Sequence, residues 1–119
     1  MEIKAIELRI GNYYQENGTI YRTTPDDITN LMRCESRKVK SDMQPIPLKE
    51  ELLYKCGFRK DNNSGKFHAA HIEICFSNGE SFGMTGNAPI YNLKCLHHLQ
   101  NIYYDLTGIE LEVKLTDER

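Results

Sequence analysis

Two Asn-Gly pairs constrain the fold of this chain more than any other feature of its sequence. Asn17-Gly18 and Asn78-Gly79 each stand between short runs that are rich in Tyr, Ile, Phe or Thr. A two-residue hairpin turn of type I′ needs a positive φ at both positions, which Asn and Gly adopt with little strain. The sequence therefore predicts two β-hairpins, one within residues 12–24 and one within residues 66–86.

Two segments show the spacing of amphipathic helices. Pro47 precedes the run 48–56, whose apolar side chains recur every three or four residues, and Gly57 stands where a helix would end. A second helix is predicted from about residue 92 to Gly108, with a continuous apolar stripe formed by Leu93, Leu96, Leu99, Ile102, Tyr103 and Leu106.

Two further segments alternate between apolar and polar residues, as strands do. Residues 28–34 fit a third strand moderately well, after a turn at Pro25-Asp26-Asp27, and residues 109–115 fit a strand with one buried face. The order of these elements predicts an α+β fold, in which antiparallel hairpins carry two helices packed on the sheet. With 119 residues and no linker or repeat, we expect a single compact domain over residues 1–119.

The charge is small overall but unevenly distributed. The net charge is −2, yet residues 33–66 carry nine Lys or Arg against five Asp or Glu. A small net charge argues against binding nucleic acid with the whole surface and leaves a local basic patch open. The densest part of that region holds Arg33, Arg37, Lys38 and Lys40, which would suit an acidic protein surface or phosphates; the alternative is a solvated loop.

Four cysteines occur without any CxxC pair, at positions 34, 56, 75 and 95. The N-terminal residues contain no apolar run of signal-peptide length, and no segment is long enough to cross a membrane. We therefore expect a cytoplasmic protein without a membrane partner, whose four thiols are free and mostly buried.

The residues that could carry catalysis or bind a metal form no recognised pattern. A zinc set of His71, Cys75, Cys95 and His98 can be drawn, but ordinary placement of these side chains is the simpler interpretation. Cys95 stands near two histidines, as a nucleophile would, without any flanking motif. The two glycines of "GMTG" (83–86) are not followed by the Lys of a phosphate-binding loop. We expect no catalytic residue, no metal and no cofactor.

The predicted helix near the C-terminus carries a second, polar face. His97, Gln100, Asn101 and Tyr104 fall three or four residues apart, beside the apolar stripe. Such side chains offer area and directional hydrogen bonds, which favours a partner-binding surface. The alternative is that they hydrogen-bond neighbouring backbone or water.

Three segments together resemble a family of small uncharacterised proteins encoded by phages and prophages of Bacteroidota-type bacteria. The family shows an ELRIGN-type start, a PIPLTEE helix ending in GF, and a HxLQNxYxxLTGxEL segment. The matching residues here are Leu8 to Asn12; Pro45 to Leu48, Glu50, Glu51, Gly57 and Phe58; and His97, Leu99, Gln100, Asn101, Tyr103, Leu106, Thr107, Gly108, Glu110 and Leu111. Lys49 stands where threonine is usual, and residues 59–94 carry none of the resemblance.

The resemblance implies the cytoplasm of a bacterial host and an origin in a mobile element. Small phage proteins without catalytic motifs are often accessory factors that act on host defence. The expected function is therefore a non-enzymatic phage accessory protein that binds a host protein, in an anti-CRISPR-like manner by blocking a CRISPR effector. The alternative is a small RNA- or DNA-binding module that uses the basic run from Arg33 to Lys40.

Overall fold

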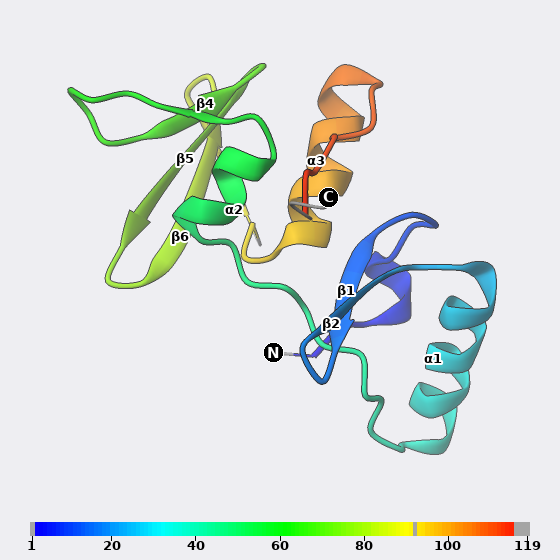
Figure 1. Ribbon diagram of the computed structural model, residues 1–119. Coiled ribbons are helices and arrows are strands. Elements are labelled where there is room, and N and C mark those ends of the chain that lie inside the picture. Colours follow the sequence, from blue (N-terminus) through cyan, green and yellow to red (C-terminus); the bar gives the residue numbers. More distant parts are fainter. Residues whose placement is uncertain (1, 92, 116–119) are drawn as a thin grey trace. The chain divides into compact units, whose positions relative to one another are not determined.

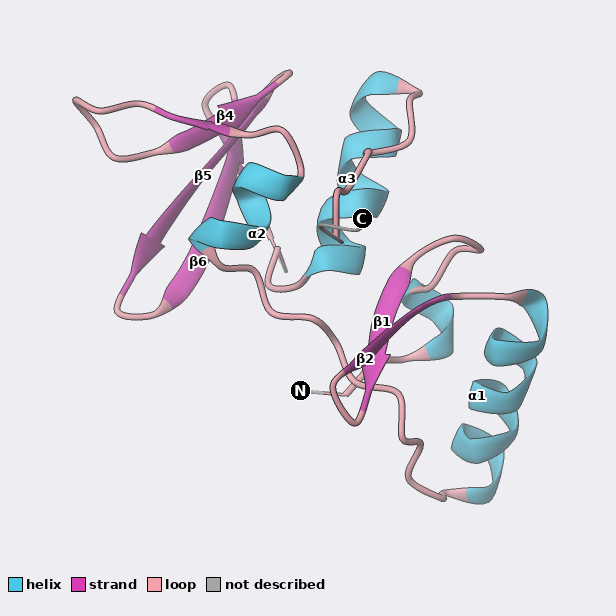
Figure 2. Cartoon of the chain, in the orientation of Figure 1, coloured by secondary structure: helices cyan, strands magenta, loops and turns pink. Residues whose placement is uncertain are grey.

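The computed structural model describes residues 2–91 and 93–115, and the chain divides into two compact units (Figures 1 and 2). Unit 1 comprises Met1–Pro47 with Cys95–Asn101, and unit 2 comprises Leu48–Lys94 with Ile102–Arg119. Helices and antiparallel hairpins occur together, so the predicted α+β class is confirmed. That the chain forms a single domain stays a prediction.

Unit 1 contains the first predicted hairpin. Strands β1 (Tyr13–Glu16) and β2 (Thr19–Arg22) pair antiparallel, and Glu16 lies opposite Thr19 across the turn. Asn17 and Gly18 have φ values of 50° and 83°, as a type I′ turn requires. The Asn-Gly signal thus set both the position and the register of this hairpin.

Helix α1 (Pro25–Arg37) replaces the third strand that we predicted over residues 28–34, so that prediction was wrong. The Thr24 side chain accepts a hydrogen bond from the Asp27 backbone, and the Asp27 carboxylate accepts one from the Thr24 backbone. This capping box, with Pro25 in the first turn, starts a helix where we expected a turn. Leu31 is buried and Ile28 half-buried, which is helical spacing of three residues.

The apolar core of unit 1 is small. The short 3₁₀ turn η1 (Ala5–Glu7) precedes the hairpin, and its first backbone N–H donates to the Glu35 carboxylate of α1 at 2.9 Å. The buried cluster comprises Ile3, Ala5, Leu8, Tyr14, Leu31 and Met43, with Ile28 packed against it.

Unit 2 is built on a five-stranded antiparallel sheet in sequential order. Its strands are β3 (Arg59–Lys60), β4 (Phe67–Ala69), β5 (Ile72–Ser77), β6 (Glu80–Thr85) and β7 (Ala88–Ile90). Ser77 lies opposite Glu80 across the Asn78-Gly79 turn, so the second predicted hairpin is confirmed as β5–β6. The predicted segment also includes β4, which pairs with β5 (Figure 2).

Helix α2 (Glu50–Lys55) lies within the run predicted to be helical, and it ends as its glycine predicts. Gly57 has a φ of 86°, and the Phe58 N–H donates to the Leu53 carbonyl at 3.0 Å, which closes the helix end. The side chains buried in unit 2 include those of Leu52, Leu53, Phe58, Phe67, Ile72, Ile74 and Leu93.

Helix α3 (Leu96–Thr107) begins four residues later than predicted, and Asn92, where we placed its start, lies outside the described residues. The described part of the chain thus contains three α-helices, where we predicted two. The strand predicted over residues 109–115 does not form, although Leu111 is buried and Lys114 N–H donates to the Lys55 carbonyl at 2.9 Å. A segment in which apolar and polar residues alternate can bury its apolar side chains without pairing to another strand. Among the described helices, none is both long and apolar enough to cross a membrane.

Candidate functional site

The first turns of α3 carry buried polar side chains that bond to the N-terminal segment of unit 1. The Gln100 Oε1 atom accepts a hydrogen bond from the Tyr13 N–H at 2.8 Å, and its Nε2 atom donates to the Gly11 carbonyl at 3.3 Å. Gln100 is 1% exposed. It therefore pairs with two backbone groups at the start of β1, of which the Gly11 carbonyl also accepts a hydrogen bond from Arg22 Nε at 3.4 Å.

Asn101 extends this network along the same segment. Its Oδ1 atom accepts hydrogen bonds from Arg9 Nε at 2.8 Å and Asn12 Nδ2 at 2.9 Å. Its Nδ2 atom donates to the Glu7 carbonyl at 2.8 Å. The amide of Asn101 thus holds three separate residues of the segment 7–12 in place.

We predicted a partner-binding surface formed by His97, Gln100, Asn101 and Tyr104, and that role stays a prediction. His97 and Gln100 are buried, and Asn101 is half-buried. The alternative interpretation, in which these groups bond to neighbouring backbone, holds for Gln100 and Asn101. Tyr104 belongs to unit 2 and is exposed, so the four side chains do not share one accessible surface.

Sequence reasoning missed the partners of this network, Glu7, Arg9 and Asn12. All three lie within the ELRIGN-type segment, residues 7–12, to which we had assigned no structural role. The structure brings that segment onto the LQN residues of α3, so two motifs about 90 positions apart form one contact.

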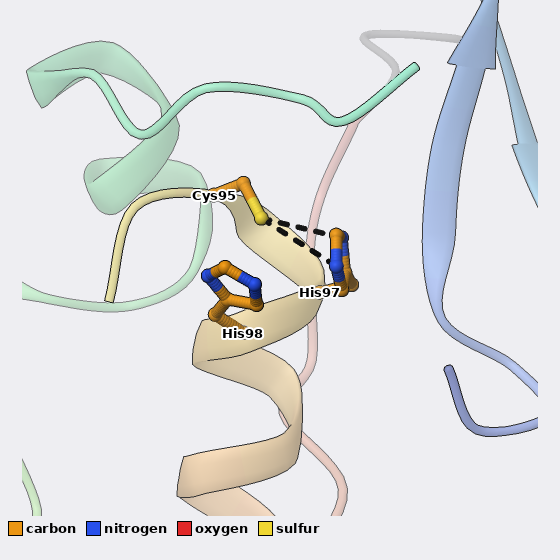
Figure 3. A group of neighbouring side chains, drawn as sticks. All are labelled: Cys95, His97 and His98. Atoms are coloured by element: carbon orange, nitrogen blue, oxygen red, sulfur yellow. Dashed lines mark hydrogen bonds between the residues drawn. The ribbon is translucent and has the colours of Figure 1, made fainter. Parts of the chain in front are cut away.

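A second cluster lies at the N-terminus of α3, where Cys95 and the two adjacent histidines meet (Figure 3). Cys95 Sγ is 3.3 Å from His97 Nδ1 and 3.6 Å from its Nε2. Glu7 Oε1 is 2.7 Å from His97 Nε2 and 3.7 Å from His98 Nε2. The His97 and His98 rings meet edge to face with their centroids 4.6 Å apart.

Burial decides how these groups are protonated. It lowers the pKa of His97, although the hydrogen bond to Glu7 opposes this, and it raises the pKa of Cys95 to about 12. A carboxylate only accepts hydrogen bonds, so neutral His97 carries its proton on Nε2 and donates it to Glu7. Its Nδ1 atom then carries no proton, and the Cys95 sulfur, which is nearly equidistant from both ring nitrogens, lies over the ring rather than on the axis of the Nδ1 lone pair.

Cys95 contacts His97, and His97 contacts Glu7. A cysteine hydrolase arranges its nucleophile, its base and its orienting group in the same order. Such chemistry requires an accessible thiolate. Cys95 is fully buried, and the direction of its pKa favours the neutral thiol. The geometry therefore suits a structural or metal-binding role better than nucleophilic attack.

The zinc set drawn from the sequence divides between the two units. Cys95 and His98 lie in unit 1, whereas His71 and Cys75 lie in unit 2. Within residues 2–91 and 93–115, one group of three possible ligands occurs, and it comprises Cys95, His97 and His98. All four cysteines are free thiols, as expected; Cys56 and Cys95 are buried, and Cys34 and Cys75 are half-buried.

The basic run forms the end of α1 and the segment that follows it. Arg33, Arg37, Lys38 and Lys40 are all exposed. Lys38 adopts a left-handed φ of 57° at the helix end, where its N–H donates to the Glu35 carbonyl at 3.2 Å. The predicted loop is thus partly helical, and its four cations project from unit 1 into solvent.

Beside this run, unit 1 contains a groove of about 600 Å³. Its apolar part includes Ile6, which is 94% exposed, and Val39, which is 58% exposed. Lys4, Lys38 and Lys40 also line it. Two acids, Glu2 and Glu35, line it too, and the Glu35 carboxylate is already bonded to the Ala5 N–H. We call this surface the basic groove.

Comparison with known proteins gives no family or relative for this chain. No family model matches it, and neither the curated proteins nor the solved structures contain a significant match.

Proposed function

We propose that the protein is a non-enzymatic binding module that uses the basic groove of unit 1 to hold an acidic, partly apolar segment of a partner protein. The observation that carries this proposal is the pair of exposed apolar side chains, Ile6 and Val39, within a groove lined by three lysines. Exposed apolar groups that gather in a hollow are typical of protein-binding surfaces.

Charge complementarity favours an acidic partner. Lys4, Lys38 and Lys40 outnumber the two acids that line the groove, and Arg33 and Arg37 add charge on the adjoining helix. Positive potential at such a rim steers an acidic partner toward the surface and raises the rate of association. The apolar side chains then supply the area whose burial stabilises the complex.

A protein partner fits better than nucleic acid for two reasons. The residues that line the groove include no aromatic side chain, so bases would have nothing to stack on. The net charge of the whole chain is −2, which opposes a long polyanion. The resemblance to phage and prophage proteins makes bacterial defence complexes, and CRISPR effectors first among them, the partners to examine.

The groove is tested with a labelled peptide that alternates Glu with Leu, by fluorescence anisotropy. Binding should weaken at least tenfold in Lys38→Glu/Lys40→Glu and in Ile6→Ser/Val39→Ser. The matched controls in unit 2 are Arg59→Glu and Ile109→Ser, which change exposed side chains of the same kinds and should leave the affinity unchanged.

Single-stranded RNA and DNA are titrated in parallel at two salt concentrations. If they bind with a steep salt dependence that the lysine variant abolishes, while the peptide does not bind, the nucleic-acid alternative replaces the proposal. If none of these probes bound, the groove would be ruled out as a binding surface. For the finer proposal, target cleavage by a purified CRISPR effector should be inhibited by the wild-type protein and restored by the lysine variant.

A further inference from the structure

We propose that Cys95, His97 and His98 bind a divalent metal ion, with zinc as the preferred metal, and that Glu7 orients His97 from behind. This site is independent of the basic groove, because none of its four residues lines that groove. It also departs from our expectation that the chain contains no metal site.

The spacing of the ligand atoms supports the proposal. One atom from each of Cys95, His97 and His98 lies within 4.8 Å of the others. Zinc bonds of about 2.3 Å to sulfur and 2.0–2.1 Å to nitrogen place tetrahedral S and N ligands roughly 3.5 Å apart. The observed distance from Cys95 Sγ to His97 Nδ1 is 3.3 Å, so the two atoms are close enough to share an ion once the side chains turn to aim the Nδ1 lone pair at it.

The surroundings of His97 resemble the support that metal-binding histidines need. A ligating histidine usually donates its other ring N–H to a carboxylate, which fixes the tautomer and the ring orientation. Glu7 Oε1 accepts that bond from His97 Nε2 at 2.7 Å, and this leaves Nδ1 without a proton and able to bind a metal. Glu7 is itself fixed, because its backbone carbonyl accepts a hydrogen bond from Asn101.

The position of Cys95 also suits a thiolate ligand. It directly precedes α3, where the backbone N–H groups of His97 and His98 favour negative charge on its sulfur. Such donors, together with the positive end of the helix dipole, stabilise negative charge on sulfur once a metal displaces the thiol proton. Two nitrogen ligands and one thiolate form a donor set that zinc prefers over calcium or magnesium.

An ion can reach this site from solvent. The side chain of His98 is 16% exposed and that of Glu7 is 29% exposed, whereas Cys95 and His97 are fully buried. Three protein ligands leave a fourth tetrahedral position for water or for a group from outside the chain. Binding would fix the start of α3, and the hydrogen bond from His97 to Glu7 connects it to η1 within the same unit.

The test is metal content and titration of the whole chain. Protein purified without chelator should contain about one zinc per chain by mass spectrometry, and stripped protein should take up one Co²⁺ with a thiolate-to-cobalt charge-transfer band. Cys95→Ser should abolish that band, and His98→Gln should abolish stoichiometric binding. Since His98 is less buried than its two neighbours, His98→Gln is the variant expected to fold normally, which far-UV circular dichroism in EDTA checks.

Glu7→Gln tests the positioning role, because it keeps the size of the side chain and removes its charge. It should weaken zinc binding by about 10- to 100-fold while one ion per chain is still bound. The matched controls, Cys75→Ser and His71→Gln in unit 2, should bind zinc as the wild type does. The proposal is overturned if wild-type protein binds neither zinc nor cobalt at micromolar concentration, or if Cys95→Ser and His98→Gln bind both metals unchanged.

Discussion

Units 1 and 2 bury different kinds of side chain. Of the described residues, Asn12, Thr23, His97 and Gln100 are buried polar groups of unit 1, whereas Ser81 is the one in unit 2. Unit 2 instead buries Phe58, Phe67, Ile72 and Ile74 around its five-stranded sheet. Unit 2 is thus stabilised mainly by apolar burial, and unit 1 depends in addition on directional bonds that demand particular partners.

This difference explains where the proposed metal site lies. Apolar cores tolerate substitution of one hydrocarbon for another, while a buried polar network specifies each atom. A site that needs a fixed imidazole or thiol is therefore easier to build within unit 1. Four predictions, in order of decreasing effect, test this contrast.

The largest effect is expected for Phe67→Ala in unit 2. Phe67 is fully buried, with ring centroids 5.3 Å from Tyr54 and 6.0 Å from Phe76. Removing the ring leaves a cavity and should lower the free energy of unfolding by about 3–5 kcal/mol. Urea denaturation measures this loss, and Phe82→Ala, at an exposed position of β6, is the control. Equal losses for both variants would contradict the assignment of the core.

The next effect concerns the polar network of unit 1. Gln100→Met keeps the length of the side chain but removes the side-chain partner of the Tyr13 N–H and one of the two partners of the Gly11 carbonyl. The free energy of unfolding should fall by about 1–3 kcal/mol. Gln44→Met, at an exposed glutamine, should be nearly neutral. If Gln100→Met were neutral too, unit 1 would tolerate apolar replacement as unit 2 does, and the contrast would fail.

A smaller loss of folding stability is expected at alkaline pH, where the Cys56 thiol of unit 2 ionises more readily in the unfolded chain. Burial raises the pKa of this thiol from 9.0 to about 12. Above pH 9 the unfolded chain releases a proton that the folded chain keeps, so the folded state loses stability as pH rises toward 12. At pH 10 the loss from this thiol should be about 1.4 kcal/mol.

Urea denaturation at pH 8 and pH 10 measures that loss. Cys56→Ala should reduce the difference between the two pH values, whereas Cys75→Ala serves as the control for removal of a less buried thiol. An unchanged difference in Cys56→Ala would show that this thiol does not carry the effect.

The smallest effects concern the helix N-termini. Thr24 caps α1 in unit 1 with a capping box, whereas Lys49 at the start of α2 in unit 2 makes no side-chain cap. Thr24→Ala should cost about 1 kcal/mol, and Lys49→Thr, which supplies a hydroxyl that can cap the helix, should add up to about 1 kcal/mol. Thermal unfolding of both variants measures these shifts. A destabilised Lys49→Thr would mean that the extended backbone of residue 49 does not suit a threonine cap.

Local chemistry explains what the sequence determined by itself. The two Asn-Gly turns placed both hairpins, and Gly57 ended α2, because each depends on φ angles that few residues adopt. The α+β class followed from those elements. The strand predicted over residues 28–34 failed because its alternation was weaker evidence than the capping box at Thr24 and Asp27, which also lay in the sequence.

Tertiary structure alone decided the role of the polar residues on α3. Helical spacing grouped His97, Gln100 and Asn101, but a face of that kind meets either a partner or the rest of its own chain. The outcome depended on residues 7–13, which are some 90 positions away and supply Glu7, Asn12 and the Tyr13 N–H as partners. Periodicity reports which side chains share a face, and only the packed chain decides what that face contacts.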